Sequence, residues 1–231
     1  MGIDTGVNSE NGKSYADETA MLHQRRKHLY CFLSGCYLHE IDGERLNSMK
    51  KTVFPIKSGL ETLDEGYSLL AGFLETSDES CLDELAVDYA KTFLSAGVAV
   101  GQAAFPYQSA YAGGGSVPAW ELAGVYAAKG LQANGCSYRV PDDHIGLQLA
   151  YMAHLCGEAT GAKNPDEMRV IAKEQKSFLD SFLFNWYYAF CRDLEKYART
   201  DFYKALAKIT AGFLSLERQL MEMEAQIWDT D

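Results

Sequence analysis

An apolar stripe at helical spacing, in the segment 138–155, places the strongest constraint on the fold of this chain. Steps of four, three and three residues separate Ile145, Leu149, Met152 and Leu155. Such spacing predicts a helix with one face in a core. Val140 precedes Pro141, and a residue before proline is driven towards extended backbone. We therefore expect the helix to begin just after this pair, with Asp142 or Asp143 as its cap.

Apolar residues recur at helical spacing along most of the chain, and no segment shows the alternation of a half-buried strand. Asn164-Pro165 is typical of a helix start, and Thr200 is placed to cap the last helix. We expect helices over about residues 14–39, 58–74, 80–94, 118–134, 142–157 and 201–228, with others ending at Pro55, opening at Asn164 and following the aromatic residues 184–190. About nine helices without a strand predict an all-α fold, a single globular, bundle-like domain.

Two stretches break the helical pattern. Residues 1–13 are rich in Gly, Asn and Ser, and we expect a flexible tail there. Residues 95–117 are rich in Gly and Ala and show no period, and a connection of this length is typical of a binding loop or a hinge. We therefore expect residues 14–231 to form one all-helical domain, with 95–117 as its long loop.

The charge balance limits the class of partner. The formal net charge is −11, whereas binding to phosphate backbones needs clustered Lys and Arg, so we expect no nucleic acid partner. An acidic surface suits a basic partner instead. Six cysteines are scattered without a Cys-x-x-Cys pair, the N-terminus lacks an apolar signal region, and no run of about 18 apolar residues occurs. These features predict a cytoplasmic protein that does not insert into a membrane.

Motifs for the common catalytic chemistries are missing. The chain has no P-loop, no Gly-x-Ser-x-Gly elbow and no His-Glu-x-x-His pair. Asp143 and His144 are adjacent on the expected helix, so their side chains diverge by about 100° and do not act as a pair. We expect no metal, no cofactor and no enzymatic activity. A metal-dependent hydrolase that uses Asp143 and His144 with partners from elsewhere in the chain is the alternative.

Four segments, taken in order, resemble one protein family. They are Asp88-Tyr-Ala-Lys-Thr-Phe-Leu-Ser-Ala-Gly97, Ala103-Ala-Phe-Pro-Tyr-Gln-Ser-Ala-Tyr111, Pro141-Asp-Asp-His144 and Thr200-Asp-Phe-Tyr-Lys-Ala-Leu-Ala207. The Pro-x-Asp-His-Ile pattern is the most specific of them. Together they resemble the TorD/DmsD family of redox-enzyme maturation chaperones over most of residues 85–215. One departure is the linker, which has only Pro106 where the family's linker is often richer in proline.

The resemblance implies a cytoplasmic chaperone that binds the twin-arginine signal peptide and the apo form of a molybdopterin oxidoreductase. Such a chaperone assists cofactor insertion and proofreading before Tat export. The resemblance also implies a monomer or a domain-swapped homo-oligomer, with 95–117 as the hinge. An assembly factor that binds a leaderless oxidoreductase subunit is a further alternative. Guanine nucleotide binding occurs in the family, but this chain has no recognisable loop for it and we do not predict it.

A twin-arginine leader has a basic segment followed by a moderately apolar one, so its receptor needs an apolar groove edged by acids. Guanidinium pairs with carboxylate through two hydrogen bonds, which makes Asp142 and Asp143 candidate acceptors. Exposed ion pairs contribute only about 0–1 kcal/mol each, so apolar contact should supply most of the affinity. His144 could instead cap the helix or brace the loop. The expected peptide-binding residues are Tyr89, Phe93 and Tyr107 as an apolar wall and Pro141, Asp142, Asp143 and His144 as a polar edge.

Overall fold

The computed structural model describes the backbone of residues 7–54, 57–97, 99, 101–111, 119–131 and 140–228. Within these ranges nine α-helices form and no strand does, so the expected all-α architecture is confirmed. The helices are α1 (Val7–Leu38), α2 (Gly43–Lys50), α3 (Glu61–Thr76), α4 (Leu82–Phe93), α5 (Ala119–Ala128), α6 (Ile145–Thr160), α7 (Pro165–Phe178), α8 (Tyr187–Tyr197) and α9 (Asp201–Trp228). Shorter turns are the 3-10 helices η1 (Glu79–Cys81) and η2 (Gln108–Ala110) and the π-helix η4 (Leu179–Leu183).

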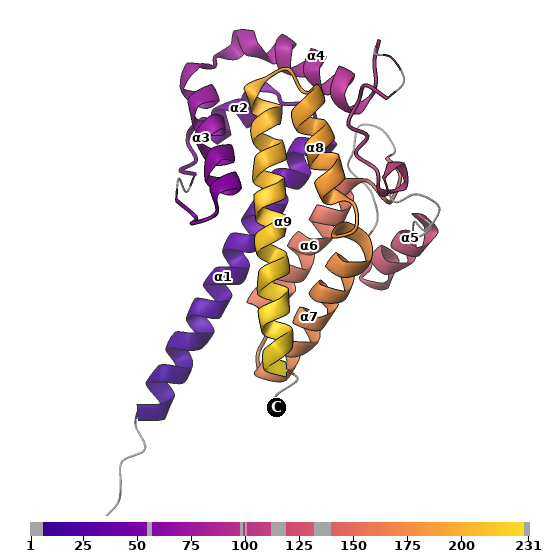
Figure 1. Cartoon of the computed structure of the whole chain (residues 1–231). Coiled ribbons are helices and arrows are strands. Elements are labelled where there is room, and N and C mark those ends of the chain that lie inside the picture. The colour runs from indigo at the N-terminus through magenta and orange to yellow at the C-terminus, as the bar shows by residue number, and fades with distance from the viewer. Residues whose placement is uncertain are drawn as a thin grey trace, which may run out of the picture.

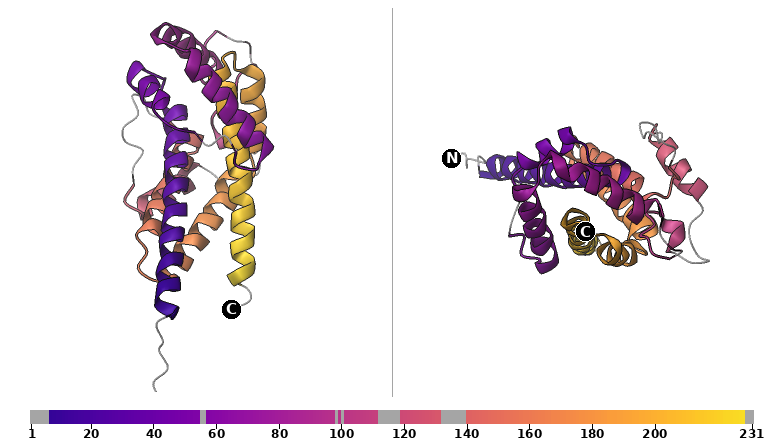
Figure 2. Two further views of the ribbon diagram at one scale, coloured as in Figure 1. Left: turned by 90° about the vertical axis from the view of Figure 1, so that its left-hand side faces the viewer. Right: turned by 90° about the horizontal axis from the view of Figure 1, so that it is seen from above.

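The last helix, α9, is the central element of the bundle. It packs against α3 and against α8, while α1 packs against α6 and α6 against α7 (Figures 1 and 2). A buried ion pair also ties the first helix to the last, because the guanidinium of Arg26 donates to both carboxylate oxygens of Glu217 at 2.8 and 2.6 Å. This two-pronged contact links the first and the last helix in the buried interior.

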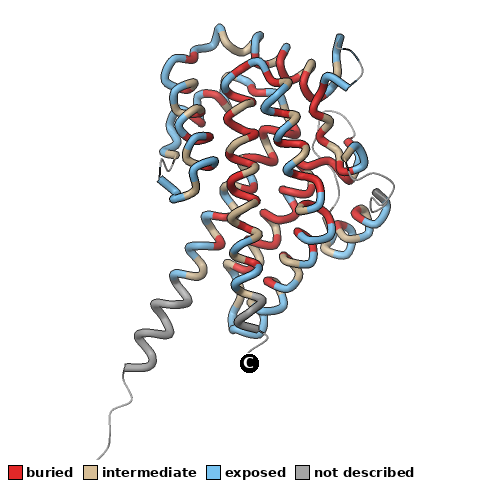
Figure 3. Tube along the Cα trace, in the orientation of Figure 1, coloured by how far each residue is buried: buried red, intermediate tan, exposed pale blue. Residues whose placement is uncertain are grey.

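Aromatic side chains fill much of the interior, and the buried faces of the central helices turn towards one another (Figure 3). One ring cluster forms around Phe93, whose ring centroid lies 5.1–6.4 Å from those of Tyr37, Tyr89, Phe190 and Tyr203. The rings come from α1, α4, α8 and α9. Full burial of each such side chain stabilises the fold by about 1.5–3 kcal/mol, so this cluster fixes the mutual positions of four helices.

Two helix starts show how well local signals worked. The start of α7 is as expected, with the Asn164 side chain accepting from the N–H of Glu167 and Pro165 as first helical residue. In contrast, α1 begins at Val7, inside the segment 1–13 that was expected to be a tail. Each residue added to an existing helix gains one backbone hydrogen bond. The helix α1 can therefore continue into polar sequence that would not start a helix by itself.

Some expectations fall on residues outside the described ranges. These are residues 1–6 of the expected tail, Pro55 as an expected helix end, residues 98, 100 and 112–117 of the expected loop, residues 118 and 132–134 of the helix expected over 118–134, and residues 229–231 of the expected domain. The described part of the loop contains no α-helix, as expected, only the single turn η2. No helix in the described part of the chain combines the length and the apolar composition needed to cross a bilayer.

Candidate functional site

The start of α6 and the 103–111 loop form a single hydrogen-bonded corner. An isolated antiparallel bridge pairs Tyr107 with His144. The N–H of Ile145 donates to the carbonyl of Pro106 at 2.8 Å, and the N–H of Gln108 donates to the carbonyl of Asp143 at 3.1 Å. The expected proximity of the loop to this helix start is therefore present, and backbone groups create it.

His144 is the N-cap of α6, a role that was expected for Asp142 or Asp143. Its Nδ1 accepts from the N–H of Gly146 at 3.0 Å, and its ring meets the ring of Tyr107 edge to face at 5.2 Å between centroids. Burial lowers the pKa of His144 to about 4, against the smaller opposing effect of the Asp143 charge. The imidazole is therefore neutral near pH 7, with Nδ1 free to accept and Nε2 carrying the proton. The alternative role considered for His144, a helix cap and loop brace, is the one that the geometry shows.

The two acids beside His144 have different surroundings. The buried Asp143 accepts from the N–H of Ser109 through Oδ2 at 2.9 Å, so its carboxylate braces the loop. The Asp142 side chain is half-buried and Pro141 is exposed. The hydroxyl of Tyr126 on α5 donates to the carbonyl of Asp142 at 3.0 Å. Only Asp142 of this acid pair is therefore in reach of a partner at the surface.

A buried glutamine pair lies directly below this corner and was not recognised from the sequence. The Nε2 of Gln148 donates to the Oε1 of Gln108 at 3.0 Å, and both side chains are completely buried. The Nε2 of Gln108 and the Oε1 of Gln148 have no hydrogen-bond partner among the residues that the structure describes. Gln148 lies three residues after Ile145 on the buried face of α6. A polar residue at that position of an apolar stripe is the sequence feature that could have indicated a buried polar pair.

Two of the three residues expected to form an apolar wall for the peptide lie inside the core. Tyr89 and Phe93 are almost fully buried in the ring cluster described above, and the Tyr89 hydroxyl donates to the carbonyl of Tyr37 at 2.9 Å. Both therefore act as core residues of the folded chain, since their helical stripe faces α1 and α9. Of the three residues in the expected wall, Tyr107 alone is partly accessible.

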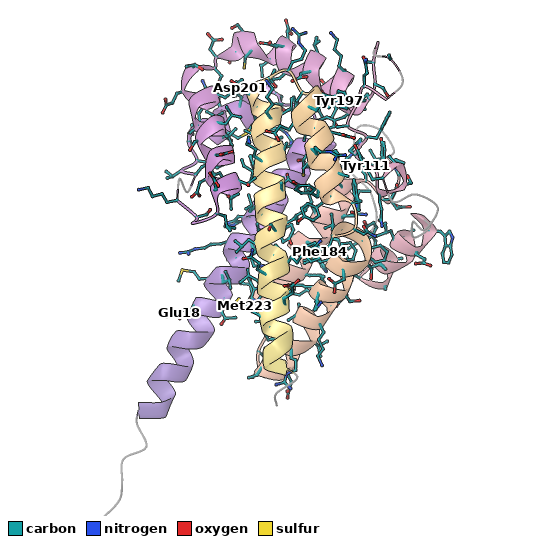
Figure 4. The ribbon with its side chains drawn as sticks, viewed as in Figure 1. Glu18, Tyr111, Phe184, Tyr197, Asp201 and Met223 are labelled. Carbon is teal, nitrogen blue, oxygen red and sulfur yellow. The ribbon has the colours of Figure 1, made fainter. Side chains whose placement is uncertain are left out.

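The far end of the 103–111 loop is also anchored on the core. The ring of Tyr111 stacks on Trp186 at 5.7 Å between centroids and meets the edge of Phe190 at 6.2 Å. Figure 4 shows Tyr111 extending from the loop to the side of α8. Tyr111 therefore packs onto the core and holds this end of the loop in place.

The side chains of Asp143 and His144 do not face one another as a catalytic pair would. Each is committed to a backbone N–H, that of Ser109 for Asp143 and that of Gly146 for His144. Across the described residues, no group of three or more His, Cys, Asp and Glu side chains is arranged to hold a metal ion. The corner as it stands offers a partner one half-buried acid, one proline and one half-buried tyrosine.

Comparison with known proteins identifies the family. The family model described as nitrate reductase delta subunit matches residues 60–192, which is more than half of the chain. Chaperone protein TorD of Vibrio cholerae serotype O1 is 24% identical over 216 residues, covering 89% of this chain and 96% of the relative. Chaperone protein TorD of Shewanella loihica is 30% identical over 211 residues, covering 84% of this chain and 92% of the relative.

One solved structure, described as a redox enzyme maturation protein from Archaeoglobus fulgidus, is 21% identical with a TM-score of 0.46, and the match covers 84% of this chain and 93% of that one. The match to the family model and the likeness to the Shewanella relative carry the assignment. The chain therefore belongs to the nitrate reductase delta subunit family and, within it, to the TorD/DmsD redox-enzyme maturation chaperones.

Proposed function

We propose that this chaperone binds the twin-arginine signal peptide and the apo form of a molybdopterin oxidoreductase in the cytoplasm. There it assists cofactor insertion and proofreading before Tat export. The observation that carries the proposal is the likeness to chaperones named TorD along nearly the whole chain. The region matched by the family model, residues 60–192, includes the Pro141–Ile145 corner.

The charge and shape of the corner support a basic peptide as the ligand. The chain carries a formal net charge of −11, which favours the approach of a cationic segment. Asp142 is half-buried and can take a guanidinium through two hydrogen bonds. The exposed Pro141 precedes it, and the half-buried Tyr107 pairs with His144, two residues further along. We assign these three residues to the peptide contact, and we assign Tyr89, Phe93, Asp143 and His144 to the scaffold that holds them in place.

The test is a pair of binding measurements on the full chain. Calorimetric titration with the twin-arginine leader of the client should give saturable binding, and replacing both arginines of the leader with lysine should weaken it about tenfold, because lysine cannot form the two-pronged pair. Capture experiments with the apo client, with and without its leader, separate the proposal from the alternative of a leaderless subunit. Equal capture of both forms, together with no binding of the free leader, would reject leader recognition.

A further inference from the structure

The helix α5 turns an apolar side towards the bundle, and a basic residue, Lys129, follows directly after its last residue. The inward side carries Leu122, Val125 and Tyr126, and Lys129 continues the same spacing just past the helix end. Leu122 and Tyr126 are buried, Val125 is partly buried, and Trp120 on the outward side is 72% exposed. The segment thus resembles, in chemistry, a short apolar peptide with one cation.

The cation is held by two acids of the bundle. The Nζ of Lys129 lies 2.8 Å from a carboxylate oxygen of Glu158 on α6 and 2.8 Å from one of Glu174 on α7. Burial disfavours the ammonium, but its bonds to the two carboxylates outweigh that effect, and the pKa of Lys129 is raised. The Tyr151 hydroxyl donates to the other oxygen of Glu174 at 2.8 Å, which fixes the orientation of that carboxylate.

A cluster of aromatic rings lies beside these acids, between α5 and the bundle. The ring of Tyr126 rests on Tyr151 at 5.5 Å between centroids, and Tyr151 in turn contacts Phe178 at 4.5 Å and Phe178 contacts Phe182 at 5.0 Å. The Tyr126 hydroxyl reaches the carbonyl of Asp142, the surface acid of the corner. The surface under α5 is therefore apolar, edged by acids at both ends, and continuous with the proposed peptide contact.

The attachment of α5 to the bundle rests on side chains more than on close backbone packing. It lies at the edge of the molecule with its outer side exposed (Figures 1 and 3), and its backbone makes few close approaches to any other helix. Ten residues is too short for a helix that is stable by itself, since isolated helices need about 12–15 residues. Gly124 in its middle, where an added Cβ would meet nothing within 4 Å, weakens it further. The helix persists because it is docked.

We propose that α5 is an intramolecular occupant of the client's docking surface, and that a basic, apolar client segment displaces it. The arginine of the client replaces Lys129 on Glu158 and Glu174, and its apolar residues replace Leu122 and Tyr126 over Tyr151. This inference rests on the proposed function, because it takes the leader as the competing segment. The surface under α5 differs from the wall expected from the sequence, because Tyr89 and Phe93 are buried against α1 and α9.

The experiment combines hydrogen–deuterium exchange with peptide titration on the full chain. The probe is a synthetic peptide with two adjacent arginines followed by an Ala- and Leu-rich segment. Addition of the peptide should accelerate amide exchange across residues 119–131, because the displaced helix loses its structure. Lys129→Met frees both acids and should tighten binding about tenfold. Gly124→Ala strengthens the closed helix without touching the surface beneath it, and should weaken binding about fivefold.

Two variants control for charge and for helix propensity. Lys176→Met removes a lysine that pairs with Asp180 at 2.6 Å on α7 and η4, and it should leave the affinity within about twofold. Gly72→Ala adds the same methyl group to α3, again with nothing within 4 Å, and should not change binding.

The outcomes separate this inference from the proposed function. Peptide binding that leaves exchange in 119–131 unchanged or slower would overturn displacement of α5 and would leave leader binding intact. Absence of binding to both the wild-type chain and Lys129→Met would overturn both. Binding to Lys129→Met alone would support α5 as a strong intramolecular competitor.

Discussion

The carboxylate of Asp88 on α4 accepts two hydrogen bonds from Thr200, one from its backbone N–H and one from its hydroxyl, each at 2.7 Å. The N–H of Arg199 also donates to this carboxylate at 3.0 Å, and the hydroxyl of Thr92 donates at 3.1 Å. Asp88 is 1% exposed, so these bonds are made away from water. They join the first and the last of the four sequence segments that resemble the family, because Asp88 belongs to one and Thr200 to the other.

Asp88→Ala should therefore lower the free energy of unfolding by about 3 kcal/mol, since it leaves buried N–H and hydroxyl groups at the start of α9 without an acceptor. The measurement is urea unfolding followed by circular dichroism. Asp83→Ala on the exposed first turn of the same helix is the matched control, and it should cost less than about 1 kcal/mol. Equal losses in the two variants would show that the contact between Asp88 and Thr200 does not stabilise the fold.

Glycine allows α3 and α9 to cross closely. A Cβ on Gly212 of α9 would lie 2.8 Å from the backbone nitrogen of Leu63, and one on Gly66 of α3 would lie 2.8 Å from the backbone nitrogen of Ile209. Because backbone atoms cannot turn aside, Gly212→Ala should destabilise the chain by about 1–3 kcal/mol. Gly72→Ala on the open side of α3 should instead stabilise it by about 0.5–1 kcal/mol. In thermal unfolding, the midpoint of Gly212→Ala should fall below that of the wild-type chain and the midpoint of Gly72→Ala should rise above it. Midpoints that shift in the same direction would contradict a close crossing at Gly212.

Because two histidines are buried, we expect the free energy of unfolding to fall in mild acid. Burial lowers the pKa of His144 to about 4, and burial together with the Arg26 charge lowers that of His23 to about 4. In the unfolded chain both titrate near 6.5. Between these values the unfolded chain binds more protons than the folded one, so stability is present above pH 6.5 and is lost as the pH falls towards 4.

The expected slope is up to about 1.4 kcal/mol per pH unit for each histidine within that window. His144→Asn keeps a side-chain acceptor for the cap of α6 and removes one titrating group. Its free energy of unfolding, measured in urea at pH 7.5 and at pH 5, should fall less steeply than that of the wild-type chain. An identical slope would mean that protonation of His144 does not contribute.

Local signals predicted the helices better than they predicted the site. The Asn164-Pro165 start and the extent of α9 follow from short-range capping and apolar spacing, and both are observed. The spacing of four residues puts Tyr89 and Phe93 on one face of α4, but spacing alone does not say what covers that face. Their partners, such as Tyr37, lie more than 50 residues away in sequence.

The cap of α6 was misassigned for a similar reason. Asp142, Asp143 and His144 are all suitable polar residues before the apolar stripe, and local chemistry favours an acid. The choice is made by the loop, because the carbonyl of Pro106 accepts from the N–H of Ile145 and fixes where the helix begins. That contact joins residues 39 positions apart, which no periodicity reveals.

The two adjacent acids of the corner should respond differently to mutation. Asp142 is half-buried and its carboxylate has no described role in the fold, so Asp142→Asn should weaken binding of the twin-arginine leader about fivefold and leave the unfolding midpoint unchanged. Asp143 is buried and braces the N–H of Ser109, so Asp143→Ala should lower the free energy of unfolding by about 1–3 kcal/mol. Its leader affinity, measured by calorimetry well below the unfolding midpoint, should stay within about twofold of the wild-type value. A loss of affinity in Asp143→Ala at full stability would place the buried carboxylate in the peptide contact, and would require the corner to open on binding.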